Sequence, residues 1–197
     1  MILEISIFLY IIYRFVENKF SGNYKPTINL DFSYKNIKIK DKIYRIQLWD
    51  TAGQEEFQSI SRGYYKIGAC ALVVYDVTDR DSFNNISSWL DECKNNGPST
   101  ITLVLVGNKI DLEDNRKVSY EEGEEFANRN NMQFFETSAL LGTNIEKLFN
   151  DTLESIIRKI ESNYYKDNES GIEFNAENNK NVDLKKNSGT KKKKKCC

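Results

Sequence analysis

The chain has 197 residues, with 28 basic and 29 acidic side chains, 40% hydrophobic residues and no histidine. This size fits one globular domain with a tail, and the lack of histidine excludes Ser-His-Asp and Cys-His nucleophiles and zinc sites built on imidazole. Two of the four cysteines are adjacent at the C-terminus, which excludes the disulfide framework of a small secreted protein and favours a reducing, intracellular location.

The first predicted element is the apolar stretch from Ile5 to Tyr13. Glu4 stands where a signal peptide carries positive charge, no small-residue cleavage site follows, and the stretch is shorter than the roughly 20 residues that span a bilayer. We therefore expect a buried element rather than a targeting segment. Its β-branched residues leave strand and helix both open, so residues 1–12 are treated as an apolar segment of undecided role.

Short apolar runs and amphipathic stretches then alternate, which indicates an α/β fold with a mostly parallel sheet and helices on both faces. Residues 32–39 and 44–50 alternate like two strands of a hairpin around the turn 40–42. Residues 71–75 and 102–106 are almost wholly apolar and predict buried strands, with a shorter candidate at 133–136. Helices are expected over 82–95, 119–130 and 144–161.

Beyond residue 162 the hydrophobic periodicity stops. Residues 163–197 contain nine lysines against five acidic residues and are rich in asparagine and serine. Such a segment buries too little apolar surface to order itself, so we expect a disordered tail after a domain that covers 13–162.

Three loops that follow predicted strands carry the candidate functional residues, and ligands of open α/β sheets bind at this edge. The first loop is Asp50-Thr51-Ala52-Gly53-Gln54, in which a carboxylate can lie near a metal while the glycine approaches a phosphate. The second, Asn108-Lys109-Ile110-Asp111, places a carboxylate that can accept two parallel N–H bonds from guanine, a donor pair that adenine lacks. The third is Thr137-Ser138-Ala139-Leu140.

In this order the motifs WDTAGQ, NKID and ETSAL resemble those of the Ras-superfamily small GTPases, and within them the Rab family of vesicle-traffic GTPases. The resemblance covers residues 13–161. It implies a Ras-like P-loop NTPase fold and a GTP/GDP-switched regulator that recruits effectors to membranes, with hydrolysis of GTP to GDP and phosphate.

The resemblance also implies a role for each matching residue. On the phosphate side, Asp50 would hold Mg²⁺ through water, Thr27 would bind Mg²⁺ in the triphosphate state, Gly53 would contact the terminal phosphate and Gln54 would position the attacking water. On the base side, Asp111 would read guanine, Asn108 would brace the loop, Lys109 would lie along the base, and the backbone of Ser138, Ala139 and Leu140 would meet the guanine oxygen.

Further positions match the family's partner-binding features. Phe32, Trp49 and Tyr64 match the aromatic triad that Rab effectors contact. Cys196 and Cys197 resemble a doubly geranylgeranylated terminus, and the five lysines before them would attract anionic lipid. The implied partners are guanine nucleotide, effectors, exchange factors, GTPase-activating proteins and the escort protein or GDI, with no nucleic acid. The implied location is the cytoplasmic face of a vesicle or organelle membrane, in exchange with the cytosol.

The sequence departs from the family at its start, because it contains no G-x-x-x-x-G-K-[ST] loop. None of the ten glycines is followed by lysine, and the loop's Lys and Ser/Thr would fall at Phe8 and Leu9. The first strand of the family is also missing, so the Ras-like domain is expected to be N-terminally incomplete. Two interpretations follow: a Rab GTPase that has lost an upstream segment, or a prenylated interaction protein that works without nucleotide, with residues 5–12 as a strand in the vacant position.

Overall fold

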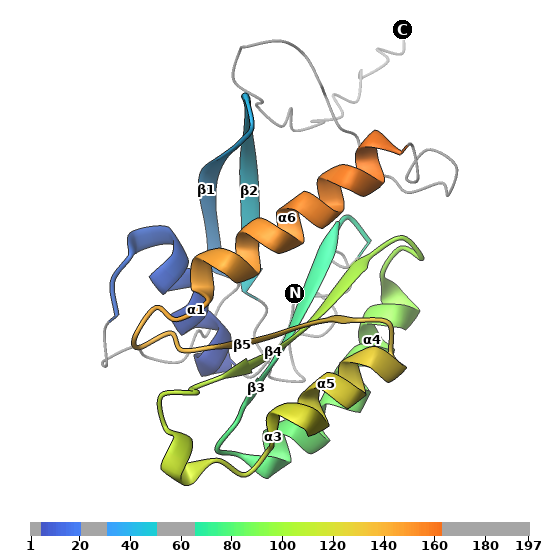
Figure 1. Cartoon of the computed structure of the whole chain (residues 1–197). Coiled ribbons are helices and arrows are strands. Elements are labelled where there is room, and N and C mark those ends of the chain that lie inside the picture. The colour runs from blue at the N-terminus through green and yellow to red at the C-terminus, as the bar shows by residue number, and fades with distance from the viewer. Residues whose placement is uncertain (1–4, 21–30, 51–65, 163–197) are drawn as a thin grey trace, which may run out of the picture.

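The computed structural model describes residues 5–20, 31–50 and 66–162 (Figure 1). Along the chain the elements are α1 (Ile5–Glu17), β1 (Asp31–Ile39), β2 (Lys42–Asp50), β3 (Cys70–Asp76), α3 (Arg80–Asn84), α4 (Ile86–Asn96), β4 (Thr102–Asn108), the 3-10 turn Glu113–Asn115, α5 (Tyr120–Arg129), β5 (Gln133–Thr137) and α6 (Ile145–Glu161). The expected strands and helices are thus confirmed. The single helix expected over 82–95 is instead two helices, α3 and α4, which meet at Asn85. The first of them begins at Arg80, before the expected start, because the Asp79 side chain caps it.

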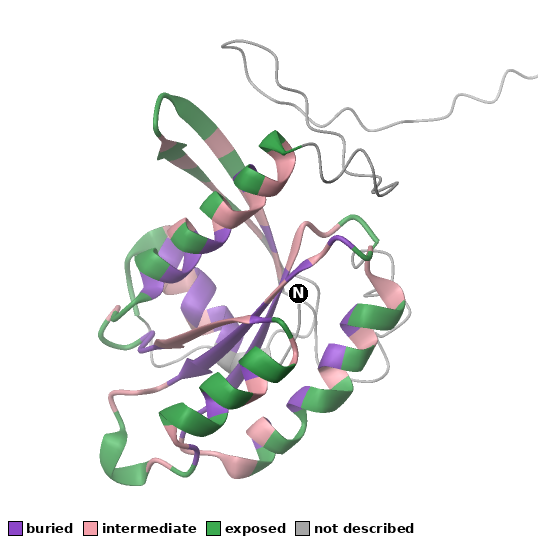
Figure 2. Cartoon of the chain, turned by 45° about the vertical axis from the view of Figure 1, so that its right-hand side comes forward, coloured by how far each residue is buried: buried purple, intermediate pink, exposed green. Residues whose placement is uncertain are grey.

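The central sheet consists of β3, β4 and β5, all parallel, in that order. Its apolar strands bury side chains on both faces, as Figure 2 shows by the purple strands between partly green helices. On one face Val73, Tyr75 and Leu105 pack with residues of α4 and α5. On the other face Leu72, Val74, Val104 and Val106 pack with α1 and α6. The predicted α/β class with helices on both faces is confirmed.

The N-terminal apolar stretch is a helix, α1, and it forms part of the core. Phe8, Ile11, Ile12 and Phe15 are all at most 4% exposed, and their i, i+3, i+4, i+7 spacing places them on one side of the helix. The interpretation of residues 5–12 as a strand is therefore wrong. The helix runs past residue 12, so the apolar segment and the start of the expected domain are one element. Among the described residues, no helix is long and apolar enough to cross a membrane.

The hairpin of β1 and β2 forms a separate sheet. Its antiparallel register runs from Asp31 opposite Asp50 to Ile39 opposite Lys42. Within the described ranges, β1 and β2 pair only with each other, and no ladder joins β2 to β3. Among the described residues, the strands thus form two sheets, the antiparallel β1–β2 pair and the parallel β3–β4–β5 sheet.

Local capping explains where α5 begins. Ser119 and Glu122 form a reciprocal capping box at the start of α5: the Ser119 hydroxyl accepts from the Glu122 N–H, and the Glu122 carboxylate accepts from the Ser119 N–H at 3.0 Å. Arg80 reaches the same carboxylate from α3 at 2.7 Å. At the start of α6, Asn144 is in the left-handed region at φ +60°, and its side chain donates to the Glu136 carbonyl instead of capping the helix.

The charged cap makes the stability of the fold sensitive to acid. The hydrogen bond from Arg80 and that from the Ser119 N–H lower the pKa of Glu122 from 4.5 to about 2. A carboxyl whose folded pKa lies below its unfolded value contributes stability above the unfolded pKa and loses it as the pH falls through the folded one. Between pH 4.5 and about 2, wild type should therefore lose more stability than Glu122→Gln, as measured by urea unfolding at several pH values. The control variant Glu125→Gln removes an exposed carboxylate of α5, and it should lose as much stability as wild type over the same pH range.

Candidate functional site

The candidate site lies where β4 and β5 end side by side. Asn108, the last residue of β4, is in register with Thr137, the last residue of β5, so the loops that follow them begin next to each other. The two loops are Lys109–Asp111 and Ser138–Leu140, which the sequence had placed at one edge of the sheet. The structure brings these two loops together.

Asn108 connects the two loops through one oxygen. Its side chain is 2% exposed, and its Oδ1 accepts from the Thr137 hydroxyl at 3.2 Å and from the Ala139 N–H at 3.1 Å. A buried amide oxygen with two donors fixes the positions of both, because losing either bond leaves a polar atom without a partner. The geometry therefore holds the Ser138–Leu140 loop against β4.

Asp111 meets the second loop through Ser138. The Ser138 hydroxyl donates to Asp111 Oδ1 in a short hydrogen bond and accepts from the Leu141 N–H at 3.0 Å. Asp111 is half-buried, whereas Ser138 is fully buried. A carboxylate held in this way at the open edge of a sheet can accept N–H donors from a planar ligand.

Lys109 is directed to a buried carboxylate. Its backbone is in the left-handed region at φ +69°, and its Nζ lies 2.6 Å from Oδ2 of Asp76, at the end of β3. The other oxygen of Asp76 accepts from the Thr78 N–H at 2.8 Å and from the Thr78 hydroxyl at 2.7 Å. Asp76 was not among the candidate residues of the sequence analysis, and its contact with Lys109 was not predicted.

Arg14 of α1 is a further residue that sequence reasoning missed. Its Nε donates to the Ala139 carbonyl at 2.8 Å, and its Nη2 donates to the Leu140 carbonyl in a short hydrogen bond. Because a trans peptide holds C=O and N–H on opposite sides, turning the Ala139 carbonyl toward α1 directs the Leu140 N–H away from it. The available signal was a single basic residue in a mostly apolar helix.

The strand before the second loop is held by an ion pair. Arg116 contacts Glu136 at 2.7 and 3.0 Å through its two terminal nitrogens, and the side chains are 17% and 10% exposed. The hydrogen bond to Glu136 is the main cause of a raised pKa at Arg116, which keeps the guanidinium charged. Planar bidentate pairing of this kind fixes orientation as well as charge.

Comparisons with known proteins decide the family. A sequence model of the Ras family matches residues 10–158. Ras-related protein Rab-2B of Dictyostelium discoideum is 47% identical over 150 residues, which are 76% of this chain and 74% of that protein. GTP-binding protein YPT1 of Saccharomyces cerevisiae is 40% identical over 184 residues, 93% of this chain and 87% of that protein. This chain belongs to the Rab family of small GTPases. It is thus a Rab-like GTPase of vesicle trafficking, and the nucleotide-independent alternative is not favoured.

The remaining Rab site positions are described only in part. Thr27, Gly53, Gln54, Tyr64, Cys196 and Cys197 lie outside the described residues, as does the tail from 163 onward. Asp50 ends β2, and its side chain is also outside the description. Phe32 is placed by its backbone alone, opposite the half-buried Trp49.

The positions where a Rab P-loop would supply Lys and Ser/Thr are part of the core here. Phe8 is fully buried and Leu9 is 5% exposed, both within α1. Two buried hydrocarbon side chains provide neither a cation for phosphate oxygens nor a hydroxyl for Mg²⁺.

Proposed function

We propose that this Rab-family chain recognises guanine nucleotides through the joined β4 and β5 loops. The observation that carries the proposal is the bridge made by Asn108 Oδ1 between Thr137 and Ala139, together with the Ser138–Asp111 hydrogen bond. In this assignment Asp111 accepts the guanine N–H groups and the Leu140 N–H meets the guanine oxygen. Asn108 braces the loops, and Lys109 lies along the base after leaving Asp76.

The phosphate side of the proposal uses residues that match the Rab motifs. Thr27 and Asp50 would hold Mg²⁺, the latter through water, Gly53 would contact the terminal phosphate and Gln54 would orient the water that hydrolyses GTP. Ordering of the Thr27 segment by the γ-phosphate would supply the switch. The glycine-rich loop that normally holds the β-phosphate is not in this sequence.

The proposed cellular role is regulated recruitment of effectors to a vesicle or organelle membrane. Phe32, Trp49 and Tyr64 would form the effector surface, and exchange factors, activating proteins and an escort protein or GDI would control the cycle. Geranylgeranyl groups on Cys196 and Cys197, together with the adjacent lysines, would attach the chain to the cytoplasmic face.

Base selectivity tests the proposal directly. Calorimetric titration of the full chain with GDP and with ADP should give GDP binding weaker than micromolar, because Phe8 and Leu9 replace the phosphate-binding side chains. GDP should nevertheless bind more tightly than ADP, and Asp111→Ala should abolish the difference, because the carboxylate pairs only with guanine.

The matched control is Asp114→Ala, which removes an exposed carboxylate three residues further along the chain. It should retain the guanine preference. Equal affinities for GDP and ADP in the unmodified chain would refute the base site, whereas micromolar or tighter GDP binding would refute the expected weakness of the phosphate site.

A further inference from the structure

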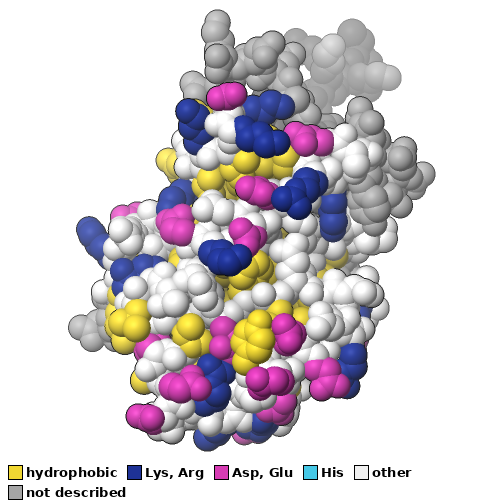
Figure 3. All heavy atoms as spheres, viewed as in Figure 1, with side chains coloured by type: hydrophobic (Ala, Val, Ile, Leu, Met, Phe, Trp, Pro, Cys, Tyr) yellow, Lys and Arg dark blue, Asp and Glu magenta, His cyan; other side chains and the backbone are white. Residues whose placement is uncertain are grey.

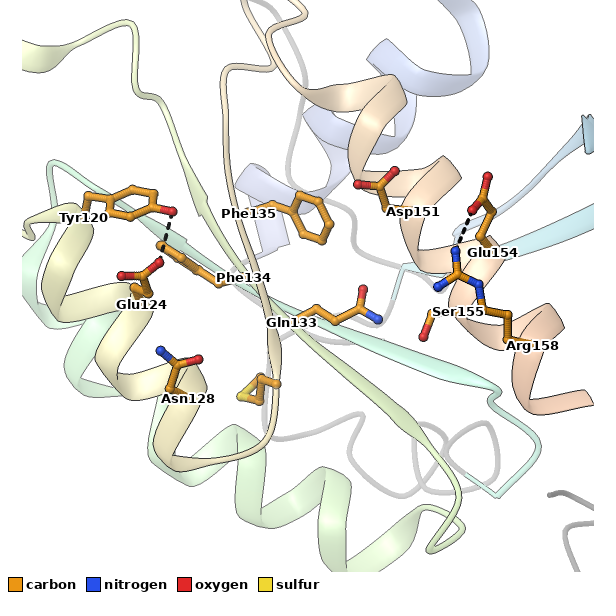
Figure 4. A pocket seen from close by; sticks show the side chains of 11 residues that line it. Tyr120, Glu124, Asn128, Gln133, Phe134, Phe135, Asp151, Glu154, Ser155 and Arg158 are labelled. Carbon is orange, nitrogen blue, oxygen red and sulfur yellow. Dashed lines mark hydrogen bonds and ion pairs between the residues drawn. The ribbon is translucent and has the colours of Figure 1, made fainter. Parts of the chain in front are cut away.

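A groove runs along the outer edge of β5, between α5 and α6, away from the proposed nucleotide loops (Figure 4). Its volume of about 650 Å³ lies within the ~300–1,000 Å³ of typical ligand pockets. The close-up shows Tyr120 and Glu124 on one wall, Asp151 and Glu154 on the other, and Phe134 and Phe135 between them. Figure 3 shows hydrophobic side chains among charged ones on the same face.

The floor of the groove is a strand edge. β5 is the last strand of its sheet, paired with β4 on one side. The Glu136 carbonyl accepts from the Asn144 side chain at 2.8 Å, so Glu136 directs its backbone groups to the outer edge. Since alternate residues of a strand face opposite edges, Phe134 does the same. Such an edge offers backbone hydrogen bonds to an added extended segment.

The walls of the groove carry three carboxylates, Glu124, Asp151 and Glu154, against one cation, Arg158. Glu124 accepts from the Tyr120 hydroxyl at 3.3 Å, and Glu154 accepts from Arg158 at 3.0 Å. Asp151 pairs with Lys147 on the preceding turn of α6. These exposed pairs stabilise little and can exchange for other cations. An extended, lysine-rich segment therefore matches both the strand edge and the carboxylates.

We propose that the chain's own basic segment, residues 180–195, binds in this groove. The segment carries eight lysines and one aspartate. It follows α6, whose Arg158 lines the groove only three residues before the helix ends at Glu161. The 17 residues between 162 and 180 can span up to about 55 Å, whereas α6 itself is about 25 Å long. The linker is thus long enough for the segment to return along the whole groove.

Binding of the basic segment in the groove competes with its binding to an anionic membrane. Lysines seated against Glu124, Asp151 and Glu154 are withdrawn from anionic lipid, and lysines on a membrane leave the groove open. This regulation goes beyond the proposed nucleotide function and does not depend on it.

Zero-length cross-linking of the full chain tests the contact. A carbodiimide joins a lysine amine to a carboxylate in direct contact, with loss of water. We expect cross-links from residues 180–195 to concentrate on Glu124, Asp151 and Glu154, and to disappear at high salt. An even spread over exposed carboxylates such as Asp91 and Asp114, or no cross-links to the body, would overturn the proposal. In a mixture of isotopically light and heavy chains, mixed cross-linked species would place the segment on a second copy and overturn the intramolecular contact.

A charge-matched pair of variants tests the consequence. The groove variant Glu124→Gln/Asp151→Asn/Glu154→Gln should bind phosphatidylserine vesicles about fivefold more tightly than the control Asp91→Asn/Asp114→Asn/Glu125→Gln, because only the former releases the lysines. Both lose three negative charges. The groove variant loses the surface ion pairs of Arg158 and Lys147, and the control loses that of Arg129. Equal vesicle affinities would contradict the competition. Thermal unfolding checks that both triple variants are folded. The cross-link map of the unmodified chain tests the contact without relying on either variant.

Discussion

Replacing Phe15 by alanine should lower the free energy of unfolding by about 3–5 kcal/mol, the usual range for truncating a buried phenylalanine. Phe15 is fully buried in α1 and stacks on Phe149 of α6 with ring centroids 3.7 Å apart. Lys35 of β1 lies 4.0 Å above the same ring. The substitution therefore removes contacts to both α6 and β1. Urea unfolding of both proteins measures the effect.

The control for this prediction is Ile43→Ala. Ile43 on β2 is 72% exposed, and a surface substitution of this kind usually changes stability by less than about 0.5 kcal/mol. If Phe15→Ala were equally harmless, α1 would not be part of the core. The N-terminal stretch would then be an apolar segment that does not pack against the rest of the domain.

A second large effect is expected when Arg116 is replaced by methionine. The change leaves the Glu136 carboxylate, which is 10% exposed, without its bidentate partner. Removing one member of a buried ion pair typically costs about 3–5 kcal/mol, because the remaining charge is desolvated without compensation. Glu136 directly precedes Thr137, so we also expect weaker guanine preference in the nucleotide titration.

The double variant Arg116→Met/Glu136→Gln should recover part of this loss, since it leaves no uncompensated charge. Arg129→Met is the matched control: Arg129 pairs with Glu125 on α5, both are 68% exposed, and such pairs contribute about 0–1 kcal/mol. Equal effects of Arg116→Met and Arg129→Met would show that the first pair is no more important than a surface contact.

Periodicity and motif order predicted most of this fold, for identifiable reasons. Strands buried on both faces must be apolar, as at 71–75 and 102–106, and the helix over 144–161 carries an apolar stripe. The short run at 5–13 fits both a helix and a strand, and only its packing against β3, β4 and α6 selects the helix.

In the site, too, residues within one motif could be predicted, whereas contacts between residues far apart in the sequence could not. Asn108 and Asp111 could be selected because they lie in one motif at the end of a buried strand. The contact of Arg14 with Ala139 joins residues 125 positions apart, and no local pattern encodes such a distance. The Asp76–Lys109 contact likewise depends on β3 and β4 being neighbours in the sheet.

The separation of the β1–β2 hairpin from the parallel sheet has a consequence for local unfolding. Side chains, among them Leu48 and Lys35, attach the hairpin to α1 and α6, without a backbone ladder to β3 within the described residues. An element attached in this way can open while the β3–β4–β5 sheet stays closed, because opening breaks no hydrogen bond of that sheet. We therefore expect two units of hydrogen exchange, with their protection coupled by α1, which contacts β1, β2 and β3.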